Sequence, residues 1–224
     1  MRRRNLNERG VTLAELLVVI AIMSVVGTML VVTLVSLSNS FASTTRSSDA
    51  RDFARQAASR MEREIRDAEA QLTTGHYLGS PAILWASANQ IVFVTTFNDA
   101  GNDLPNAKPL AIKYFLESGT LYMRRDAGDD GEWDGARPIS FVPNVVNGSV
   151  GPSGSTPVFS YTYVNDNGDH IAVHPTDDAQ SLTETLRARI TSVSFTLVVD
   201  ANLGHSPAAT TITTTAQLRN QRQF

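Results

Sequence analysis

The first hydrophobic feature of the chain is one long apolar run that begins at Val11. Between Leu16 and Thr45 the sequence contains no Asp, Glu, Lys or Arg. A bilayer core of about 30 Å requires about 20 apolar residues in a helix, and residues 16–35 meet that length. The pattern therefore predicts a transmembrane helix over residues 11–37.

The residues that follow predict that the helix continues as an amphipathic extension over residues 38–74. Apolar side chains recur every three or four residues, which is the spacing of one helix face. These side chains are Phe53, Ala57, Met61, Ile65, Ala68 and Leu72. Charged residues, Glu64 among them, occupy much of the remaining surface, and we interpret them as a solvated face. Glu62 and Arg66 are spaced for an ion pair, and the Ser/Thr/Asn-rich residues 36–48 are the expected place for a bend or fraying.

After Gly75 the hydrophobic pattern changes to alternation, which predicts β-strands. The predicted strands are residues 82–85, 90–97, 110–116, 120–124, 140–146, 158–164, 190–199 and 210–218. Glu117-Ser118-Gly119 predicts a hairpin with a short glycine-containing loop. A β-rich domain packed on the apolar face of one helix is an α+β architecture. We therefore predict an antiparallel β-rich globular domain over residues 75–224.

Charge divides the chain into a basic start and an acidic remainder. Residues 1–10 contain four arginines and one glutamate, a local charge of +3, and since the whole chain carries −3 the remainder carries −6. Arginines before the apolar run, with none close after it, place the N-terminus in the cytoplasm and the C-terminal domain outside. The acidic balance gives no clear nucleic-acid site. A removable secretory signal is the alternative, but its apolar region would be about 7–15 residues, which this run exceeds.

Glu15 is the only ionisable residue between Val11 and Thr45. Such a side chain in a membrane segment is costly and indicates a function, although a position at the headgroup interface is the alternative. Gly10-Val11-Thr12-Leu13-Ala14-Glu15-Leu16, behind an arginine-rich leader over residues 1–10, resembles the N-terminal signal of type IV pilins and type II secretion pseudopilins. The resemblance implies cleavage after Gly10 by a prepilin peptidase and N-methylation of Val11, where the family more often has Phe. It also implies that Glu15 is the family's signature glutamate.

This resemblance implies a structural subunit, a minor pilin or a pseudopilin, with a pilin-like fold and no enzymatic activity. The subunit would be a single-pass protein of the bacterial cytoplasmic membrane that joins a surface filament after assembly. Its implied partners are the prepilin peptidase, other pilins or pseudopilins, an inner-membrane assembly platform and membrane lipid. In a filament, Glu15 of one subunit could neutralise the α-amino group of Val11 in its neighbour and set the register of packing. The hairpin at residues 114–124 and the end of the last strand resemble the larger minor pilins and J-type pseudopilins.

Two alternatives come from other functional classes. One is a single-span, membrane-anchored extracytoplasmic ligand-binding protein. The other is an anchored enzyme, but the sequence has no nucleophile elbow, phosphate-binding loop or paired-histidine zinc helix. The absence of cysteine also excludes a disulfide scaffold, a thiolate zinc site, an iron–sulfur cluster and a cysteine nucleophile.

An acidic segment is the strongest metal candidate in the sequence. Five carboxylates fall within nine residues, at Asp126, Asp129, Asp130, Glu132 and Asp134. Oxygen ligands on a flexible loop suit Ca²⁺, although Gly128 and Arg137 occupy two ligand positions of the EF-hand pattern. A solvated acidic loop is the alternative, and no other cofactor is expected.

His170 and His174 share a face that could hold a transition metal. We favour the alternative that both histidines are simply exposed to solvent.

Overall fold

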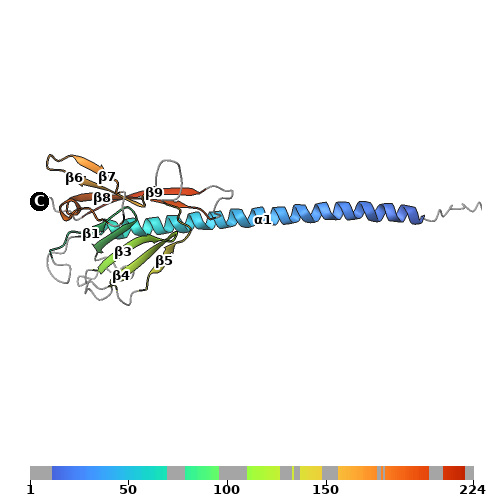
Figure 1. Ribbon diagram of the computed structural model, residues 1–224, viewed down its shortest axis with the longest axis horizontal. Coiled ribbons are helices and arrows are strands. Elements are labelled where there is room, and N and C mark those ends of the chain that lie inside the picture. Colours follow the sequence, from blue (N-terminus) through green and yellow to red (C-terminus); the bar gives the residue numbers. More distant parts are fainter. Residues whose placement is uncertain are drawn as a thin grey trace, which may run out of the picture. The chain divides into compact units, whose positions relative to one another are not determined.

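The computed structural model describes residues 12–69, 79–95, 110–126, 133, 137–147, 156–175, 178, 180–201 and 209–219. The chain divides into two compact units, residues 1–45 and 46–224. The elements, most of which are labelled in Figure 1, are α1 Leu13–Arg66, β1 Ile83–Ala86, β2 Gln90–Thr95, β3 Leu110–Glu117, β4 Thr120–Asp126, β5 Ile139–Val142, β6 Phe159–Val164, β7 His170–Val173, α2 Glu184–Arg187, β8 Ile190–Val199 and β9 Thr210–Gln217.

Helix α1 continues without interruption through residues 36–48, where the sequence predicted a bend or fraying. The hydroxyl of Ser40 donates to the carbonyl of Ser36 at 3.0 Å, and that of Thr44 donates to the carbonyl of Ser40 at 2.9 Å. These side chains bond back to the helix that carries them, a pattern that often bends a helix but here leaves it continuous. The expectation of fraying was wrong, and the expected bend stays a prediction.

The helix ends at Arg66, several residues earlier than predicted. Ala68 forms an isolated antiparallel bridge with Thr95, and the backbone N–H of Glu69 donates to the carbonyl of Val94 at 3.0 Å. The chain leaves the helix because its backbone groups pair with β2 instead. This competing partner lies far away in the sequence, so helical periodicity alone could not reveal it.

The strands form two sheets in which every neighbouring pair is antiparallel. The first sheet has the order β1-β2-β3-β4-β5, and the second has the order β7-β6-β8-β9. Every predicted strand overlaps an observed one, whereas β7 and the single-turn helix α2 were not predicted. Ser118 and Gly119 have φ values of 47° and 74°, which is the type I′ geometry that suits the tight hairpin between β3 and β4.

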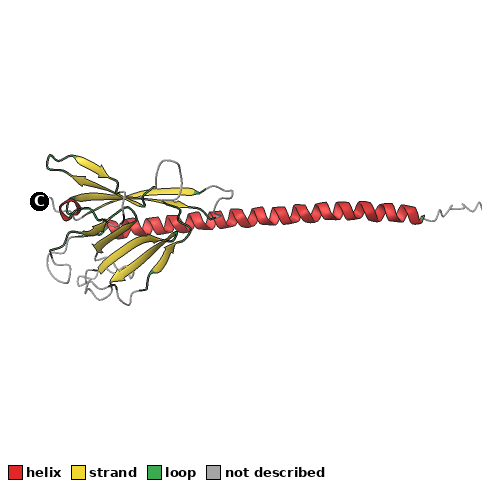
Figure 2. Ribbon diagram, in the orientation of Figure 1, coloured by secondary structure: helices red, strands yellow, loops and turns green. Residues whose placement is uncertain are grey.

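The core of the unit formed by residues 46–224 lies where the C-terminal part of α1 meets both sheets, which flank it in Figure 2. Three of the buried apolar side chains of the helix are alanines, which allow close approach of the sheets; the buried apolar set is Ala54, Ala57, Ala58, Met61 and Ile65. Large aromatic side chains fill the sheet side, among them Phe93, Tyr114, Phe159, Tyr161 and Phe195. The predicted α+β class is confirmed. Phe53 is an exception to the predicted apolar face, because its side chain is 48% exposed.

Candidate functional site

Glu64 anchors α1 to the first sheet through hydrogen bonds with three other side chains. Its Oε1 accepts from Nε of Arg60 at 3.0 Å and from Nη2 of Arg125 at 3.2 Å. The phenol of Tyr114 donates to Oε2. The Glu64 side chain has no exposed surface, and two guanidinium groups compensate its charge. A carboxylate buried with this many donors avoids most of the penalty of an isolated buried charge.

The interpretation of Glu64 as part of a solvated face was wrong. The side chains that cover it, Tyr114 and Arg125, lie 50 and 61 positions further along the chain. The only local signal is that Glu64 lies three residues after Met61 and directly before Ile65, at the edge of the apolar stripe. Burial and the negative charge of Glu64 raise the pKa of Tyr114 well above its ordinary value, so the phenol keeps the proton that it donates.

The structure describes only part of the acidic segment. Asp126 is the last residue of β4, lies opposite Ala111 and is 1% exposed, so this carboxylate is buried rather than solvated. Asp129, Asp130, Glu132 and Asp134 lie outside the described residues, and the Ca²⁺ site stays a prediction. Among the residues that the structure does describe, no group of three or more His, Asp or Glu side chains could hold a metal. His170 and His174 are both exposed, as expected.

The predicted assembly residue Glu15 lies in the first turn of α1 and is exposed. Its Oε2 accepts from the backbone N of Thr12 at 2.9 Å and from the Thr12 hydroxyl at 3.1 Å. In return, the backbone N of Glu15 donates to Oγ1 of Thr12 at 3.3 Å. This reciprocal pair is a capping box, which satisfies amide groups at the start of a helix. This capping role was not predicted, although the Thr-x-x-Glu spacing indicates it.

Beyond Glu15, apolar side chains are exposed on every side of the helix. They include Leu16, Leu17, Val18, Val19, Ile20, Ile22, Met23, Val25, Val26, Met29, Leu30, Val31, Val32, Leu34, Val35 and Leu37. Helix α1 is long and apolar enough to cross a membrane, with a mean hydropathy of 2.7 over its most apolar stretch. That criterion concerns length and composition alone, and a secretory signal also meets it.

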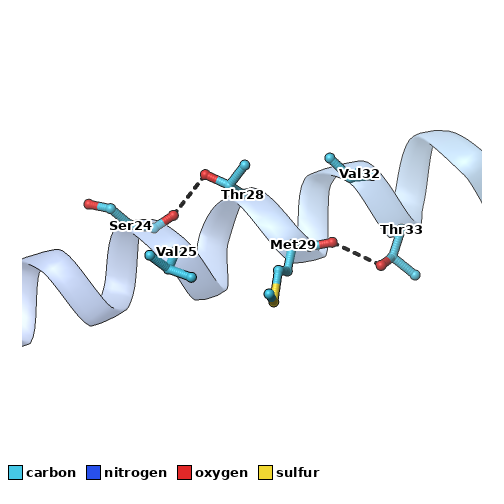
Figure 3. Close-up of a pocket in the computed structure, with 6 residues that line it drawn as sticks. All are labelled: Ser24, Val25, Thr28, Met29, Val32 and Thr33. Atoms are coloured by element: carbon cyan, nitrogen blue, oxygen red, sulfur yellow. Dashed lines mark hydrogen bonds between the residues drawn. The ribbon is translucent and has the colours of Figure 1, made fainter.

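The polar side chains within this apolar stretch bond inside the helix. Figure 3 shows a shallow pocket on the helix surface in which the Thr28 hydroxyl donates to the carbonyl of Ser24 and the Thr33 hydroxyl donates to that of Met29, both at 2.8 Å. The Ser24 hydroxyl donates in the same way to the carbonyl of Ile20 at 2.8 Å. Hydroxyls that are satisfied in this manner do not need water, so the segment remains compatible with lipid or with other apolar helices.

The sequence of this end of the chain matches one family. Residues 5–31 fit the family described as the prokaryotic N-terminal methylation motif. The chain carries this motif. The matched residues include Gly10, Val11 and Glu15, so the predicted prepilin-type signal is confirmed as a motif. Gly10 and Val11 lie outside the residues that the structure describes. The processing and the individual roles of the three residues stay predictions.

Three solved structures show distant similarity to the motif-bearing chain. A complex of two pseudopilins from the type 2 secretion system of Vibrio vulnificus is 12% identical, with a TM-score of 0.46 over 78% of this chain and 94% of that one. A complex of three type 2 secretion proteins from enterotoxigenic Escherichia coli is 16% identical, with a TM-score of 0.42 over 77% and 99% of the chains. A type IV-like pilin from Thermus thermophilus is 12% identical, with a TM-score of 0.39 over 77% and 98%. No curated protein matches the sequence significantly.

Proposed function

We propose that this protein is a structural subunit of a type IV pilin-like filament, either a minor pilin of a pilus or a pseudopilin of a type II secretion system. One observation carries the proposal: the methylation motif over residues 5–31 runs directly into a helix that exposes apolar side chains on every side. A helix without a polar face requires lipid or similar helices around it. A membrane-held subunit that later packs into a filament meets that requirement in both of its states.

The N-terminal chemistry of the proposed subunit begins with cleavage after Gly10 by a prepilin peptidase and N-methylation of Val11. The new amino group of Val11 then lies about one helical turn before Glu15. In the filament, Glu15 neutralises the amino group of an adjoining subunit, which removes an unpaired charge from apolar surroundings. Before assembly the same carboxylate caps its own helix through Thr12, so docking exchanges one set of donors for another.

The arginine-rich leader over residues 1–10 supports an N-terminus in the cytoplasm and a C-terminal domain on the other side of the bacterial cytoplasmic membrane. The partners of the proposed subunit are membrane lipid, the prepilin peptidase, other pilins or pseudopilins and an inner-membrane assembly platform. Its role is structural rather than catalytic. The alternative of a membrane-anchored ligand-binding protein would retain the leader and remain a single subunit.

Mass spectrometry of the protein extracted from its native membrane tests the proposal. A chain that begins with N-methyl-Val11 is expected, together with recovery of the protein in sheared filaments or in cross-linked assemblies with other pilins. An intact Met1 on a chain found only in the membrane would overturn the proposal and favour the anchored ligand-binding protein.

A further inference from the structure

The first sheet carries a polar and aromatic site on the face that points away from α1. Tyr114 and Met123 point into the core, and the side chains that alternate with them along β3 and β4 therefore lie on the opposite face. Two adjoining cross-strand pairs occupy its centre: Lys113 faces Arg124, and Phe115 faces Tyr122. We name these four side chains the outer-face block.

The two cations of the outer-face block converge on one aromatic ring. Nζ of Lys113 lies 5.1 Å from the centroid of Phe115, and Cζ of Arg124 lies 5.6 Å from it. Like charges that face each other directly across two strands destabilise a sheet. Burial is the main cause that lowers the pKa of Lys113, the charge of Arg124 lowers it further and the charge of Glu117 opposes the shift, so part of the shift reflects this cost. An anion placed between the two cations would relieve it.

Two hydrogen-bond donors in the same row of the sheet are buried without an acceptor. They are Nε of Arg124 and Nε1 of Trp85. Trp85 of β1 lies opposite Val92 of β2, which lies opposite Lys113, so one register row connects Trp85 to Arg124. Buried donors are nearly always paired in native proteins. Nε of Arg124 is therefore a donor of the outer-face block that no acceptor among the described residues satisfies.

The aromatic half of the outer-face block lies on central strands of the sheet rather than at an edge. The rings of Phe115 and Tyr122 are stacked, with their centroids 5.6 Å apart and their planes 24° from parallel. Both side chains are half-buried, so part of each remains accessible. Cations beside aromatic rings on one face of a sheet are the combination with which proteins hold single-stranded nucleic acid, through the phosphates and through base stacking.

We propose that the outer-face block binds a nucleotide unit, with its phosphate between Lys113 and Arg124 and its base against Tyr122. The Cα atoms of residues that face each other on antiparallel strands are about 4.5–5.5 Å apart, so one phosphate can contact both cations. The unit comes either from a free nucleotide or from a single strand of nucleic acid. An acidic peptide would satisfy the cations but leave the aromatic pair unused, which makes it the weaker candidate. This inference does not depend on the proposed filament role.

Fluorescence anisotropy of a labelled short oligodeoxythymidylate, titrated with the full chain in detergent, tests the inference. Saturable binding is expected, with a slope of log affinity against log salt of about −0.7 for the one phosphate that both cations contact. Lys113→Gln/Arg124→Gln should flatten the slope, and Tyr122→Leu should weaken binding by about tenfold or more. The matched control is Arg46→Ala/Arg55→Ala, which removes two exposed cations from α1 and should bind normally.

Thymidine monophosphate and inorganic phosphate separate the sources of the ligand. If the monophosphate displaces the oligonucleotide, and Tyr122→Leu weakens this competition, the site binds a nucleotide. If the oligonucleotide binds more tightly than the monophosphate, the ligand is a single strand of nucleic acid. Inorganic phosphate that competes as well as the monophosphate would overturn the inference in favour of a simple anion site. Polyglutamate that binds in place of the oligonucleotide, or equal binding by all variants, would also overturn it. The single variant Lys113→Gln should raise the melting temperature by removing the charge repulsion, so lost binding cannot be attributed to unfolding.

Discussion

Glu64 on α1 and Tyr114 on β3 lie 50 positions apart in the sequence, yet the tyrosine hydroxyl donates a hydrogen bond to the carboxylate within the core. The Tyr114 ring also contacts Phe93 and Phe141, with centroid distances of 6.2 Å and 5.1 Å. Its position is therefore fixed by aromatic packing as well as by the hydrogen bond. The pair ties the C-terminal part of α1 to the centre of the first sheet.

Removal of the Glu64 carboxylate should destabilise the protein strongly. Glu64→Ala leaves Arg60 and Arg125 without their buried counter-charge, and breaking a buried ion pair costs about 3–5 kcal/mol. Tyr114→Phe removes one hydrogen bond to a charged group and should cost about 1–3 kcal/mol. The free energy of unfolding, measured with denaturant by tryptophan fluorescence, checks both values.

Glu62 provides the matched control for this experiment. It pairs with Arg66 on the surface of the same helix, and such pairs contribute only a few tenths of a kcal/mol. Glu62→Ala should therefore leave stability almost unchanged. Equal effects of the two glutamate substitutions would show that the buried network does not hold the helix on the sheet.

Alkaline pH should destabilise the fold through its buried tyrosines. Burial raises the pKa of Tyr114 and of Tyr161 well above the ordinary value of about 10. Below that pH both tyrosines are protonated whether the chain is folded or not. Above it, the unfolded chain loses protons that the folded chain keeps, so the free energy of unfolding falls by up to about 1.4 kcal/mol per pH unit for each tyrosine.

Thermal melts between pH 8 and pH 12 check this dependence. Tyr161→Phe should lose stability at neutral pH, because the phenol donates to the carbonyl of Ser87 at 2.9 Å, and it should show a shallower alkaline decline. An unchanged slope in Tyr161→Phe would contradict the role of the buried phenol.

The elements whose residues carry a local pattern could be predicted from the sequence. Alternating residues in β8 and the short Ser118-Gly119 loop gave correct positions, since strand period and turn chemistry are local properties. Strand β7 was missed because its residues His170–Val173 are largely exposed on both faces and show no alternation. The early end of α1 and the burial of Glu64 depend on distant partners, Thr95 and Tyr114, which no local pattern contains.

The candidate sites follow the same division between local and distant information. Glu15 belongs to a contiguous motif, and both its family match and its capping partner Thr12 can be read within a few residues. The outer-face block could not be predicted, because Lys113 and Arg124 meet only once the register of β3 and β4 is fixed. The same register places Asp126 in a buried position, which its acidic neighbours in the sequence do not indicate.

Gly10→Val should block processing, because we expect the proposed prepilin peptidase to require a small residue before the cleaved bond. Mass spectrometry of the membrane-extracted variant should find the leader still attached. Leu6→Val, a substitution of similar size within the leader, should be processed normally. Loss of residues 1–10 from the Gly10→Val chain would show that cleavage occurs elsewhere.

Ca²⁺ should raise the melting temperature of the full chain if the acidic segment is a metal site. Asp130→Ala/Asp134→Ala removes two of the proposed ligands without touching the buried Asp126, so the variant separates metal binding from the packing of β4. The Ca²⁺-dependent shift should disappear in this variant. No shift at millimolar Ca²⁺ in the unmodified protein, or an equal shift in the variant, would remove the segment from consideration.

Glu15 has two roles that substitutions can separate: it caps its own helix through Thr12, and it is proposed to neutralise the Val11 amine of a neighbouring subunit. Glu15→Gln keeps a side chain that can complete a capping box but removes the charge. Thr12→Ala keeps the charge but removes the hydroxyl that takes part in the cap. Glu15→Val removes both functions. None of these changes adds a charge to the apolar segment, so all three variants should still be cleaved and remain in the membrane.

Incorporation into filaments then decides between the two roles. If the charge sets the register of assembly, Glu15→Gln and Glu15→Val should both be depleted from sheared filaments by about a hundredfold or more, because each leaves a neighbouring amine unpaired among apolar helices. Thr12→Ala should incorporate almost normally. Wild-type neighbouring subunits must be present, since a minor subunit can be required in only a few copies. Normal incorporation of Glu15→Gln, with loss of Thr12→Ala, would assign Glu15 to helix capping and remove it from the subunit contact.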